Sequence, residues 1–447
     1  MSPKVWGHAV LSLGWLFWGQ VAVAADLLQV FQAAQMQDAT VRASRAAAQA
    51  VRERLPQARA HMLPAISASL SRNDNRLVST TPSFFGTEQS TDSAYRSSNE
   101  SLVVRQPLFR GGLMAQYDLA QAQVDESEAN LAQDEQELAV RVATAYFEAL
   151  LAQEQNGLLQ SQRTANLKQL ESARATFKAG SGTRTDVDEA QARLDMVDAQ
   201  LLESRLNVDY TLRQVQSFVD DPIGAVAPLH PERLGAVAVN HGTLDEWLER
   251  VVAASPRIKA LSAQVEAARL DVRRNAAGHY PSLDVVGQWT RSASENVQNV
   301  NSRYTNASVG LQLQIPIYSG GSVSAAVRQA LANQERAEHA LEAGLRDLRL
   351  RVHKEYRAMV ESVPRIHAYE QAQRSAEQMV LSNQMSFKAG SRTVMDVLNA
   401  EQQRMVTRRD LMQSRLQYVL ARVRLNAMLD GGGQTAIVAI SPLFADK

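Results

Sequence analysis

One stretch of sequence occurs twice in this chain. Phe387–Ala400 reads FKAGSRTVMDVLNA, and Phe177–Ala190, about 210 residues earlier, reads FKAGSGTRTDVDEA. In register, the two stretches share Phe, Lys, Ala, Gly, Ser, Thr, Asp, Val and Ala. A repeat of this length indicates a duplicated half-domain rather than a short solenoid unit. Because each copy lies between two long helical patterns, we expect each to be the tip of a helical hairpin.

The first 24 residues are typical of a secretory signal peptide. Lys4 provides a positive charge, Val10–Trp18 is apolar, and Ala22–Ala24 has the small residues of a cleavage site. A membrane anchor is the alternative, but the apolar run is shorter than the ~20 residues that a spanning helix needs. No later segment is apolar for that length. We therefore expect an exported chain that starts near Ala25 and that, if it spans a membrane, does so with strands.

Composition excludes several kinds of site. The chain has no cysteine, which excludes disulfides, thiol nucleophiles and a lipid attached through cysteine. Its 47 basic and 47 acidic side chains give no net charge, and the basic ones are dispersed, so no nucleic-acid partner is expected. The histidines lack metal-ligand spacing, and the glycines of Ala179–Thr183 lack the Lys-Ser/Thr of a phosphate-binding loop. We predict no enzyme, no cofactor and no metal site.

Each half of the chain repeats the same predicted order of elements. We expect a first repeat over residues 25–219, a linker over 220–242, a second repeat over 243–430 and a tail over 431–447. The predicted elements are helices over 26–60 and 243–278, strand pairs over 65–107 and 282–316, exposed loops over 72–94 and 291–303, long helices over 113–178 and 322–388 with a kink and interruption at Pro364, tips over 177–190 and 387–400, and return helices over 185–219 and 394–429.

Alternation of apolar and polar residues marks the strands. In Ala307–Ile315 every odd residue is apolar, and every even residue is polar or glycine. This period of two fits a half-buried strand of an ordinary β-sandwich, and it also fits a transmembrane strand between lipid and water. The signal peptide and the neighbouring long helices favour the transmembrane interpretation.

The long helical segments cannot belong to a compact globule. Residues 113–178 contain no proline and carry apolar or small residues at 3–4 spacing over several heptads, which indicates coiled-coil-like packing. At ~1.5 Å per residue, such a helix is about 100 Å long.

The same sequence motif ends each strand pair: a proline, an aromatic residue two positions later, and then two glycines. We predict a strand-to-helix corner in each half, where the glycines adopt φ values that other residues avoid. The predicted corner residues are Pro107, Gly111, Gly112, Pro316, Gly320 and Gly321.

Both tips have the residues of a tight turn between two helices. A glycine is expected to end the incoming helix, and a threonine is expected to cap the returning helix, with an aspartate in its first turn. The predicted turn glycines are Gly180 and Gly390, the predicted caps Thr185 and Thr393, and the predicted aspartates Asp186 and Asp396. A stable helical hairpin without further function is one interpretation of this pattern.

Arg392 favours a second interpretation, in which the tips form a gate. It is a charge in the second tip where the first tip has Gly182, and it is placed to pair with Asp186 of a neighbouring tip. If several subunits surround an axis, Asp396 repeats as a ring of carboxylates. Such a ring raises the pKa of some of its members and attracts cations.

Taken together, the duplication, the strand pairs, the long helices and both tips resemble the TolC family of outer-membrane efflux and secretion channels. The resemblance covers nearly the whole mature chain, and Gly390–Ala400 resembles the family's pore-constricting hairpin. It implies a mixed α+β membrane protein that forms a homotrimer in the outer membrane of a Gram-negative bacterium. Four strands per protomer would build a shared twelve-stranded β-barrel, continued by an α-helical barrel through the periplasm.

The resemblance also implies a function and partners. The chain would be the passive exit duct of a tripartite system for type I protein secretion or multidrug efflux. Its partners would be a periplasmic adaptor, an inner-membrane ABC or RND-type transporter, outer-membrane lipid and an exported protein or small molecule. By position, Asp396 matches the family's pore-lining aspartate. Arg392 matches the arginine that links the inner hairpin to the outer one, and Thr185 and Asp186 match its partners.

Two residues depart from the family pattern. Asn399 stands where the best-known members carry a second aspartate, and Phe387 stands where they carry a tyrosine that hydrogen-bonds across the gate. Both departures predict a gate that is less cation-selective and more easily opened.

Two other classes of function compete with the channel. A periplasmic coiled-coil adaptor or scaffold would share the signal peptide and the helices, but it needs no lipid-facing strands. An exported enzyme would need a catalytic constellation, which the sequence does not display.

Overall fold

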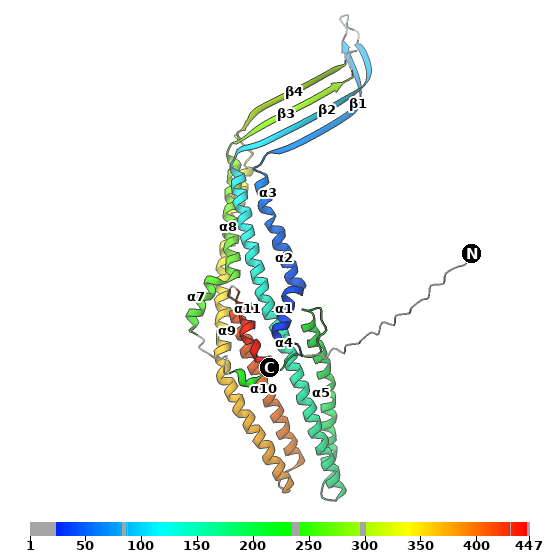
Figure 1. Cartoon of the computed structure of the whole chain (residues 1–447), viewed down its shortest axis with the longest axis vertical. Coiled ribbons are helices and arrows are strands. Elements are labelled where there is room, and N and C mark those ends of the chain that lie inside the picture. The colour runs from blue at the N-terminus through cyan, green and yellow to red at the C-terminus, as the bar shows by residue number, and fades with distance from the viewer. Residues whose placement is uncertain are drawn as a thin grey trace, which may run out of the picture.

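The structure, a computed structural model, describes residues 24–82, 86, 88–234, 242–295, 301–429 and 431–444. The predicted signal peptide lies outside the described residues apart from Ala24, as does part of the predicted linker. Figure 1 shows an elongated molecule with a four-stranded sheet at one end, two helical hairpins at the other and long helices between them.

Both halves of the chain have the same order of elements. The first half contains α1 (Leu27–Gln37), α2 (Ala39–Arg52), α3 (Arg54–Ala60), β1 (Ala65–Pro82), β2 (Glu88–Arg110), α4 (Gly111–Lys178) and α5 (Arg184–Gln216), followed by η1 (Pro231–Arg233). The second half contains α7 (Leu244–Ala254), α8 (Pro256–Ala276), η2 (Ala277–His279), β3 (Ser282–Ser294), β4 (Ser302–Gln314), α9 (Ser322–Lys388) and α10 (Val394–Asn426), followed by α11 (Gly432–Ile440) and η3 (Ser441–Leu443). The repeat in the sequence is therefore a repeat of structure, in which α4 and α5 correspond to α9 and α10.

The predicted single helices over 26–60 and 243–278 are wrong, because both bend at equivalent points. At Asp38 the backbone leaves the helical region with ψ of 120°, and its carboxylate accepts a hydrogen bond from the Val41 N–H at 2.9 Å, which starts α2. Ser255 has ψ of 122° because the proline after it disfavours helical backbone.

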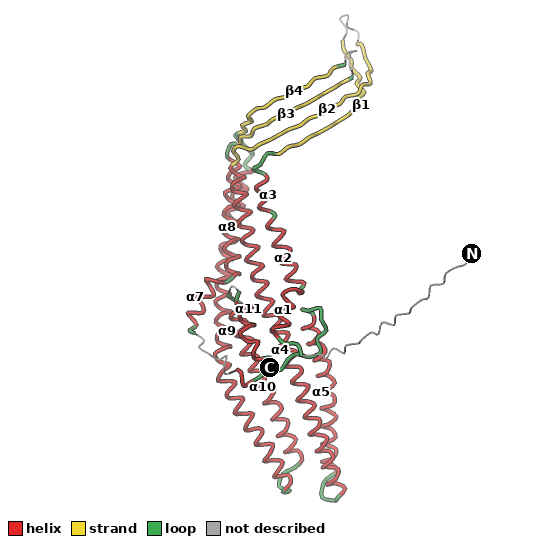
Figure 2. The backbone as a smooth tube through the Cα atoms, viewed as in Figure 1, coloured by secondary structure: helices red, strands yellow, loops and turns green. Residues whose placement is uncertain are grey.

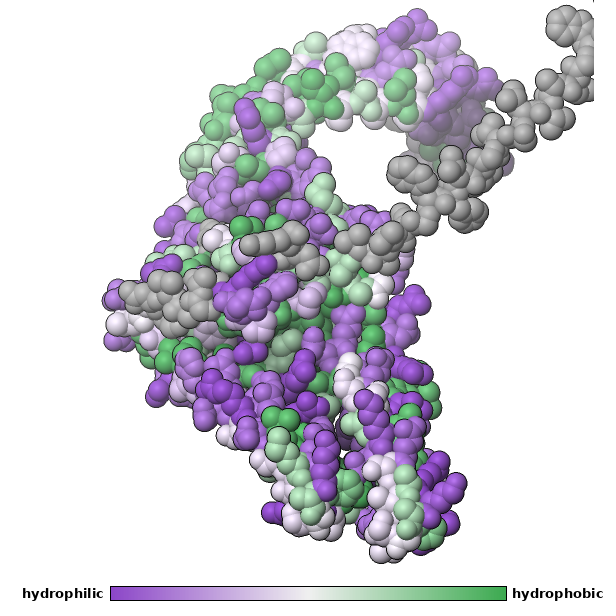
Figure 3. Space-filling view, turned by 60° about the horizontal axis from the view of Figure 1, so that its bottom comes forward, coloured by the Kyte–Doolittle hydropathy of each residue, from purple (hydrophilic) through white to green (hydrophobic). Residues whose placement is uncertain are grey.

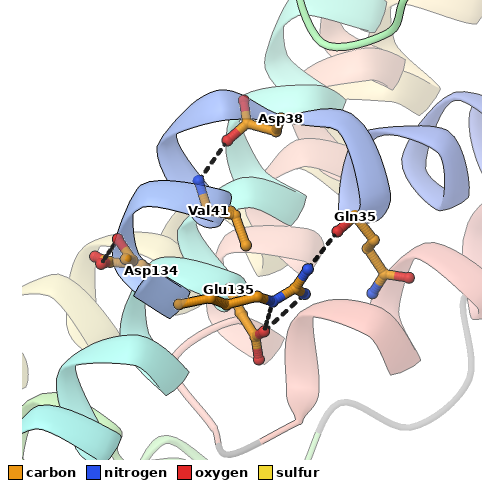
Figure 4. Close-up of polar contacts among 7 residues, drawn as sticks. Gln35, Asp38, Val41, Asp134 and Glu135 are labelled. Carbon is orange, nitrogen blue, oxygen red and sulfur yellow. Dashed lines mark hydrogen bonds and ion pairs between the residues drawn. The ribbon is translucent and has the colours of Figure 1, made fainter. Parts of the chain in front are cut away.

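Arg45 on α2 holds the first of these bends. It donates to the Gln35 carbonyl of α1 at 2.8 Å and to Glu135 of α4 at 2.8 and 3.0 Å (Figure 4). Arg141 of α4 contacts the buried carboxylate of Asp38 at 3.1 Å. The bend is therefore tied to the long helix that it packs against.

The long helices extend almost the whole distance from the sheet to the tips. α4 has 68 residues and α9 has 67. α9 continues through Pro364, so the predicted interruption is wrong; a proline removes one backbone hydrogen bond, and packing along the rest of the helix keeps it continuous. α5 returns along α4 and α10 returns along α9, which gives two hairpins (Figure 2). In the described part of the chain, no helix is both long enough and apolar enough to cross a membrane.

The four strands form one antiparallel sheet in the order β1-β2-β3-β4, and its register gathers the apolar residues on one face. Two neighbouring rows across that face are Ile66, Val104, Gly287 and Val309, and Ala68, Leu102, Trp289 and Ala307. Nothing in the described chain covers this face, since Val309 is 83% exposed and Ile66 is 69% exposed. Figure 3 shows hydrophobic residues along the arch of the sheet. The opposite face carries mostly serine, threonine and glutamine.

The predicted exposed loop over 72–94 is wrong. β1 and β2 remain paired as far as Pro82 and Glu88, and ion pairs such as Arg76–Asp92, at 2.6 Å, join the two strands. This part of the ribbon is mostly polar on both faces, with Leu77 and Val78 as exceptions. The alternation that reveals a half-buried strand is therefore absent from its sequence.

The strands of the second pair are also longer than predicted. β3 reaches Ser294 and β4 begins at Ser302, so the predicted loop over 291–303 is shortened at both ends. Residues 296–300 lie outside the described residues. The first strand pair thus extends further from the helices than the second.

The two strand-to-helix corners differ. Gly320 and Gly321 have φ of 65° and 80°, the left-handed values that a glycine corner requires. For Gly111 and Gly112 the prediction is wrong, because β2 runs directly into α4 and these glycines are its first two helical residues. A Cβ at Gly111 would lie 3.2 Å from the Tyr280 ring, so close approach explains this glycine.

The two corner prolines also lie differently. Pro107 is inside β2, at a register shift between Pro107 and Phe109, where prolines are tolerated in strands. The extra residue there brings Phe109 onto the apolar face, opposite Leu283. Pro316 follows the end of β4.

The largest hydrophobic core lies midway along the molecule, where α1, α4, α9, α10 and α11 meet (Figure 1). Tyr146, Phe147 and Phe444 pack ring against ring, with centroids 5.4 to 6.2 Å apart. The segment 431–447, expected to be a tail, supplies α11 and η3 to this core, and Ile437 is completely buried.

Candidate functional site at the helical tips

Both tips begin with the same backbone turn. Gly180 and Gly390 follow the ends of α4 and α9, and each has φ of 77°. The Gly180 N–H donates to the Phe177 carbonyl at 3.0 Å, and the Gly390 N–H donates to the Phe387 carbonyl at 2.9 Å. Such bonds satisfy carbonyls that the helix end leaves without partners, and glycine adopts the required backbone without strain.

A capping box then begins each returning helix. The Asp186 N–H donates to the Thr183 hydroxyl at 3.1 Å, and the Thr183 N–H donates to the Asp186 carboxylate at 3.0 Å. Thr393 and Asp396 repeat this pair at 3.3 and 2.9 Å. The prediction that Thr185 caps α5 is wrong: Thr183 is the residue that matches Thr393 in the repeat, and Thr185 is exposed inside the first turn.

Asp396 is held as an anion by its own tip. The hydrogen bond from the Thr393 backbone, together with the one from the Thr393 hydroxyl, lowers the pKa of Asp396 below its usual value. The guanidinium of Arg392, 3.4 Å away, acts in the same direction. A rise in pKa from a ring of carboxylates requires other copies of the chain, and within one chain the cap and the arginine dominate.

The expected pair of Arg392 with Asp186 does not form within the described chain. Arg392 contacts Asp396, while Asp186 contacts Thr183. The pair stays a prediction for tips of neighbouring chains. Phe387 is half-buried near the end of α9, so its ring is partly available to such a neighbour.

Asn399 has a partner that sequence reasoning missed. Arg193 of α5 donates to the Asn399 side-chain oxygen at 2.9 Å and to the Gln402 side-chain oxygen at 3.4 Å, both on α10. In the repeat, Arg193 corresponds to Gln403, so the repetition that marks the tips carries no signal for this arginine.

The two hairpins separate toward their tips. Figure 3, in which the tips are turned toward the viewer, shows them as two lobes. A cleft of about 470 Å³ lies between α4, α5 and α10, and its lining is mainly polar, with Gln155, Glu203, Asn207 and Gln402 among its residues. No group of three or more His, Asp or Glu side chains in the described ranges is arranged to hold a metal ion.

Known proteins share this architecture over most of the chain. The family model of outer membrane efflux proteins matches residues 30–219 and 247–431. The alkaline protease secretion protein AprF of Pseudomonas aeruginosa is 32% identical over 90% of this chain and 84% of its own length. The proteases secretion protein PrtF of Dickeya chrysanthemi is 30% identical over 93% of this chain and 89% of its own length. A crystal structure of a membrane protein from Pseudomonas aeruginosa has the same fold, with a TM-score of 0.77 at 19% identity, over 92% of this chain and 91% of that one.

The family match includes both halves of the duplication, with their strand pairs, long helices and tips. The resemblance to the TolC family, drawn from the residues, is thereby confirmed. The chain belongs to the outer membrane efflux protein family and, like its relatives, is an export channel of the bacterial outer membrane.

Proposed function

We propose that three copies of this chain form one channel, whose sheets close a twelve-stranded β-barrel in the outer membrane. One chain supplies four strands, and small closed barrels need about eight. Among the described residues of one chain, β1 and β4 each have one edge without a partner strand. Joining β4 of one copy to β1 of the next pairs every edge, which is what a closed barrel requires.

The apolar face of the sheet supports its place in lipid. From Ala307 to Ile315, eight steps of ~3.3 Å give an apolar run of about 26 Å along the strand. Tilted by about 35–45°, as barrel strands are, this run spans about 20 Å along the membrane normal, which is most of the ~25 Å apolar band of outer-membrane barrels. The polar face of the sheet then lines the interior, and the doubly polar extension of β1 and β2 lies outside the lipid.

The helices continue the duct into the periplasm, and the tips close it. In this arrangement Asp396 forms a ring of carboxylates at the narrowest point, and Asn399 adds no charge to it. Arg392 pairs with Asp186 and Thr185 of a neighbouring tip, and Phe387 lacks the hydroxyl that would add a further link. The capped turns support this role, because they fix the backbone at both tips.

The proposed cargo is a secreted protein of the protease class. The support for this is the similarity to AprF and PrtF, both named for protease secretion. The proposed partners are a periplasmic adaptor and an inner-membrane transporter of the ABC type, which supply the energy. The channel itself carries out no catalysis and lets the cargo pass passively.

A secretion assay tests this cargo. The chain is expressed in Pseudomonas aeruginosa cells that lack AprF, and protease activity is measured in the medium. We expect this chain to restore secretion. PrtF is expressed in the same cells as a control, and it shows whether their adaptor and transporter work with a channel from another species. Restoration by PrtF but not by this chain, with the chain present in the outer membrane, would contradict a protease cargo.

A further inference from the structure

We propose that Arg193 is a clasp that holds the two hairpins of one protomer together and places a positive charge beside the gate. The proposal rests on the proposed gate at the tips. It concerns a residue that is absent from the gate links inferred from the sequence.

The clasp joins distant parts of the chain. The guanidinium of Arg193, on α5, reaches Asn399 at 2.9 Å and Gln402 at 3.4 Å, on α10. Asp396, Asn399 and Gln402 are spaced three residues apart, so they lie on one stripe of α10. Arg193 therefore contacts the same stripe that carries the pore-facing aspartate in the proposed gate.

Both ends of the clasp are fixed by packing. On α5, Leu194 is 7% exposed, and Asn166 of α4 donates to the Arg193 carbonyl at 3.4 Å. On α10, Leu398 and Ala400 are buried on either side of the exposed Asn399. The two partners therefore sit on well-packed helices, and the contact does not depend on a loose loop.

Apolar packing between α5 and α10 is sparse near this contact. The hydrophobic cluster nearest the tips is Leu170, Ala173, Ala190 and Leu194, and it belongs to the first hairpin alone. Above the clasp, α5 and α10 are separated by the polar cleft that Gln402 helps to line. α4 and α10 also meet at this level, where Ala165 of α4 and Val397 and Leu398 of α10 line one small cavity. Between α5 and α10, hydrogen bonds such as those of Arg193 contribute to holding the two helices together.

The clasp also changes the charge beside the gate. Arg392 and Asp396 offset one another within a tip, and Asn399 has no charge. The acceptors of Arg193 are two neutral amides, so its positive charge is not cancelled by them. Each protomer thus brings one additional cation close to the carboxylate ring, which lowers its attraction for cations.

Conductance of the full-length protein in planar bilayers separates the two effects. Arg193→Gln removes both the clasp and the charge, and we expect open probability to rise about 2- to 10-fold, the factor for losing ordinary hydrogen bonds, together with a stronger cation preference. Asn399→Ala removes the principal acceptor but keeps the charge of Arg193, so it should raise opening with a smaller change in selectivity than Arg193→Gln, and combining the two variants should add little. Arg213→Gln is the matched control, because it removes the same charge from the same helix, where Arg213 pairs only locally with Asp209.

A second measurement, the distance between the two tips of one chain, tests the role of Arg193 independently of conductance. The chain has no cysteine, so Ser181 and Ser391, one in each tip turn, can be replaced by cysteine and spin-labelled without background. Labelled chain is diluted with unlabelled chain, and the distance between the two labels is measured. We expect a broader and longer distance in Arg193→Gln and no change in Arg213→Gln. If Arg193→Gln changes neither the distance between the labels nor the open probability, the proposed role of Arg193 is overturned. A wild-type protein that does not conduct would overturn the proposed function instead, and the distance measurement would still test Arg193.

Discussion

Arg110, the last residue of β2, holds the buried carboxylate of Asp284 on β3 with two hydrogen bonds, of 2.9 and 2.5 Å. The two residues come from different halves of the duplication. β2 and β3 are also the two central strands of the sheet. This ion pair therefore fastens one repeat to the other at the point where the sheet meets the long helices.

The burial of Asp284, whose side chain is 6% exposed against 37% for Arg110, makes a stability prediction. Arg110→Gln or Asp284→Asn should destabilise the protein by about 1.5–3 kcal/mol, because each leaves a charged partner without its hydrogen bonds. Arg76–Asp92 has the same chemistry and joins β1 to β2 at 2.6 Å, but both side chains are exposed. Arg76→Gln should therefore cost about 1 kcal/mol or less. Thermal unfolding in detergent measures both, and equal losses would contradict the importance given to burial.

The corrected cap gives a second prediction. Thr183→Ala should destabilise α5 by about 0.5–2 kcal/mol, since the hydroxyl that accepts from the Asp186 N–H is lost. Thr185→Ala, two residues further on, should have almost no effect on stability. Limited proteolysis at the tip compares the two variants. If the Thr185 variant were cleaved faster than the Thr183 variant, Thr185 and not Thr183 would be the cap of α5.

The turn glycines give a third prediction. Gly390→Ala forces an alanine to adopt φ of 77°, which should cost about 1–2 kcal/mol. Gly157→Ala is the control, because Gly157 lies inside α4 with open space where the Cβ would be. That substitution should stabilise the protein by about 0.5–1 kcal/mol. Opposite shifts of the unfolding temperature are expected, and shifts of the same sign would contradict the assigned backbone roles.

Asp38 gives a prediction about pH. Burial alone would raise the pKa of Asp38, but hydrogen bonds from the Val41 N–H and from Arg141 outweigh burial and hold the pKa below 3.8. A carboxyl with a lowered pKa in the folded state stabilises that state above its unfolded pKa, and the contribution is lost as the pH falls through the lower, folded pKa. Asp38→Asn, which keeps a capping oxygen, should thus lower the unfolding temperature at pH 7 and approach the wild type as the pH falls below 3.8 toward the lowered pKa of the folded state. A constant difference across this range would count against the charge pair.

The sequence predicted those parts of the fold in which one face is buried or uniformly apolar. Ala307–Ile315 alternates because one side of β4 is apolar, and α4 shows its helical spacing because it packs along its whole length. The ribbon beyond Leu70 was missed because both its faces are mostly polar and its two apolar residues, Leu77 and Val78, are adjacent and do not alternate. The bend at Asp38 was missed because aspartate is compatible with a helix, and only the contacts with Arg141 and Val41 show why the helix stops there.

Only those parts of the candidate site that occur in both copies of the repeat were predicted. Repetition identified the tips and the aspartates of both capping boxes, because both copies carry them. It did not identify Arg193, which has no counterpart in the other copy and whose partners lie about 200 residues away in the sequence. The choice of Thr185 as the cap was wrong although the register of the repeat already places Thr183 opposite Thr393, and the backbone geometry agrees with that register.

Ion selectivity of single channels tests the central claim, a trimeric duct gated by the tips. Purified full-length protein is placed in planar bilayers under a salt gradient, and the reversal potential is compared between wild type, Asp396→Asn and Arg392→Ser. We expect the wild type to conduct as a trimer, Asp396→Asn to lose cation preference, and Arg392→Ser to conduct more because the tips are less firmly held. A non-conducting monomer, or conductance and selectivity unchanged in both variants, would contradict the gate.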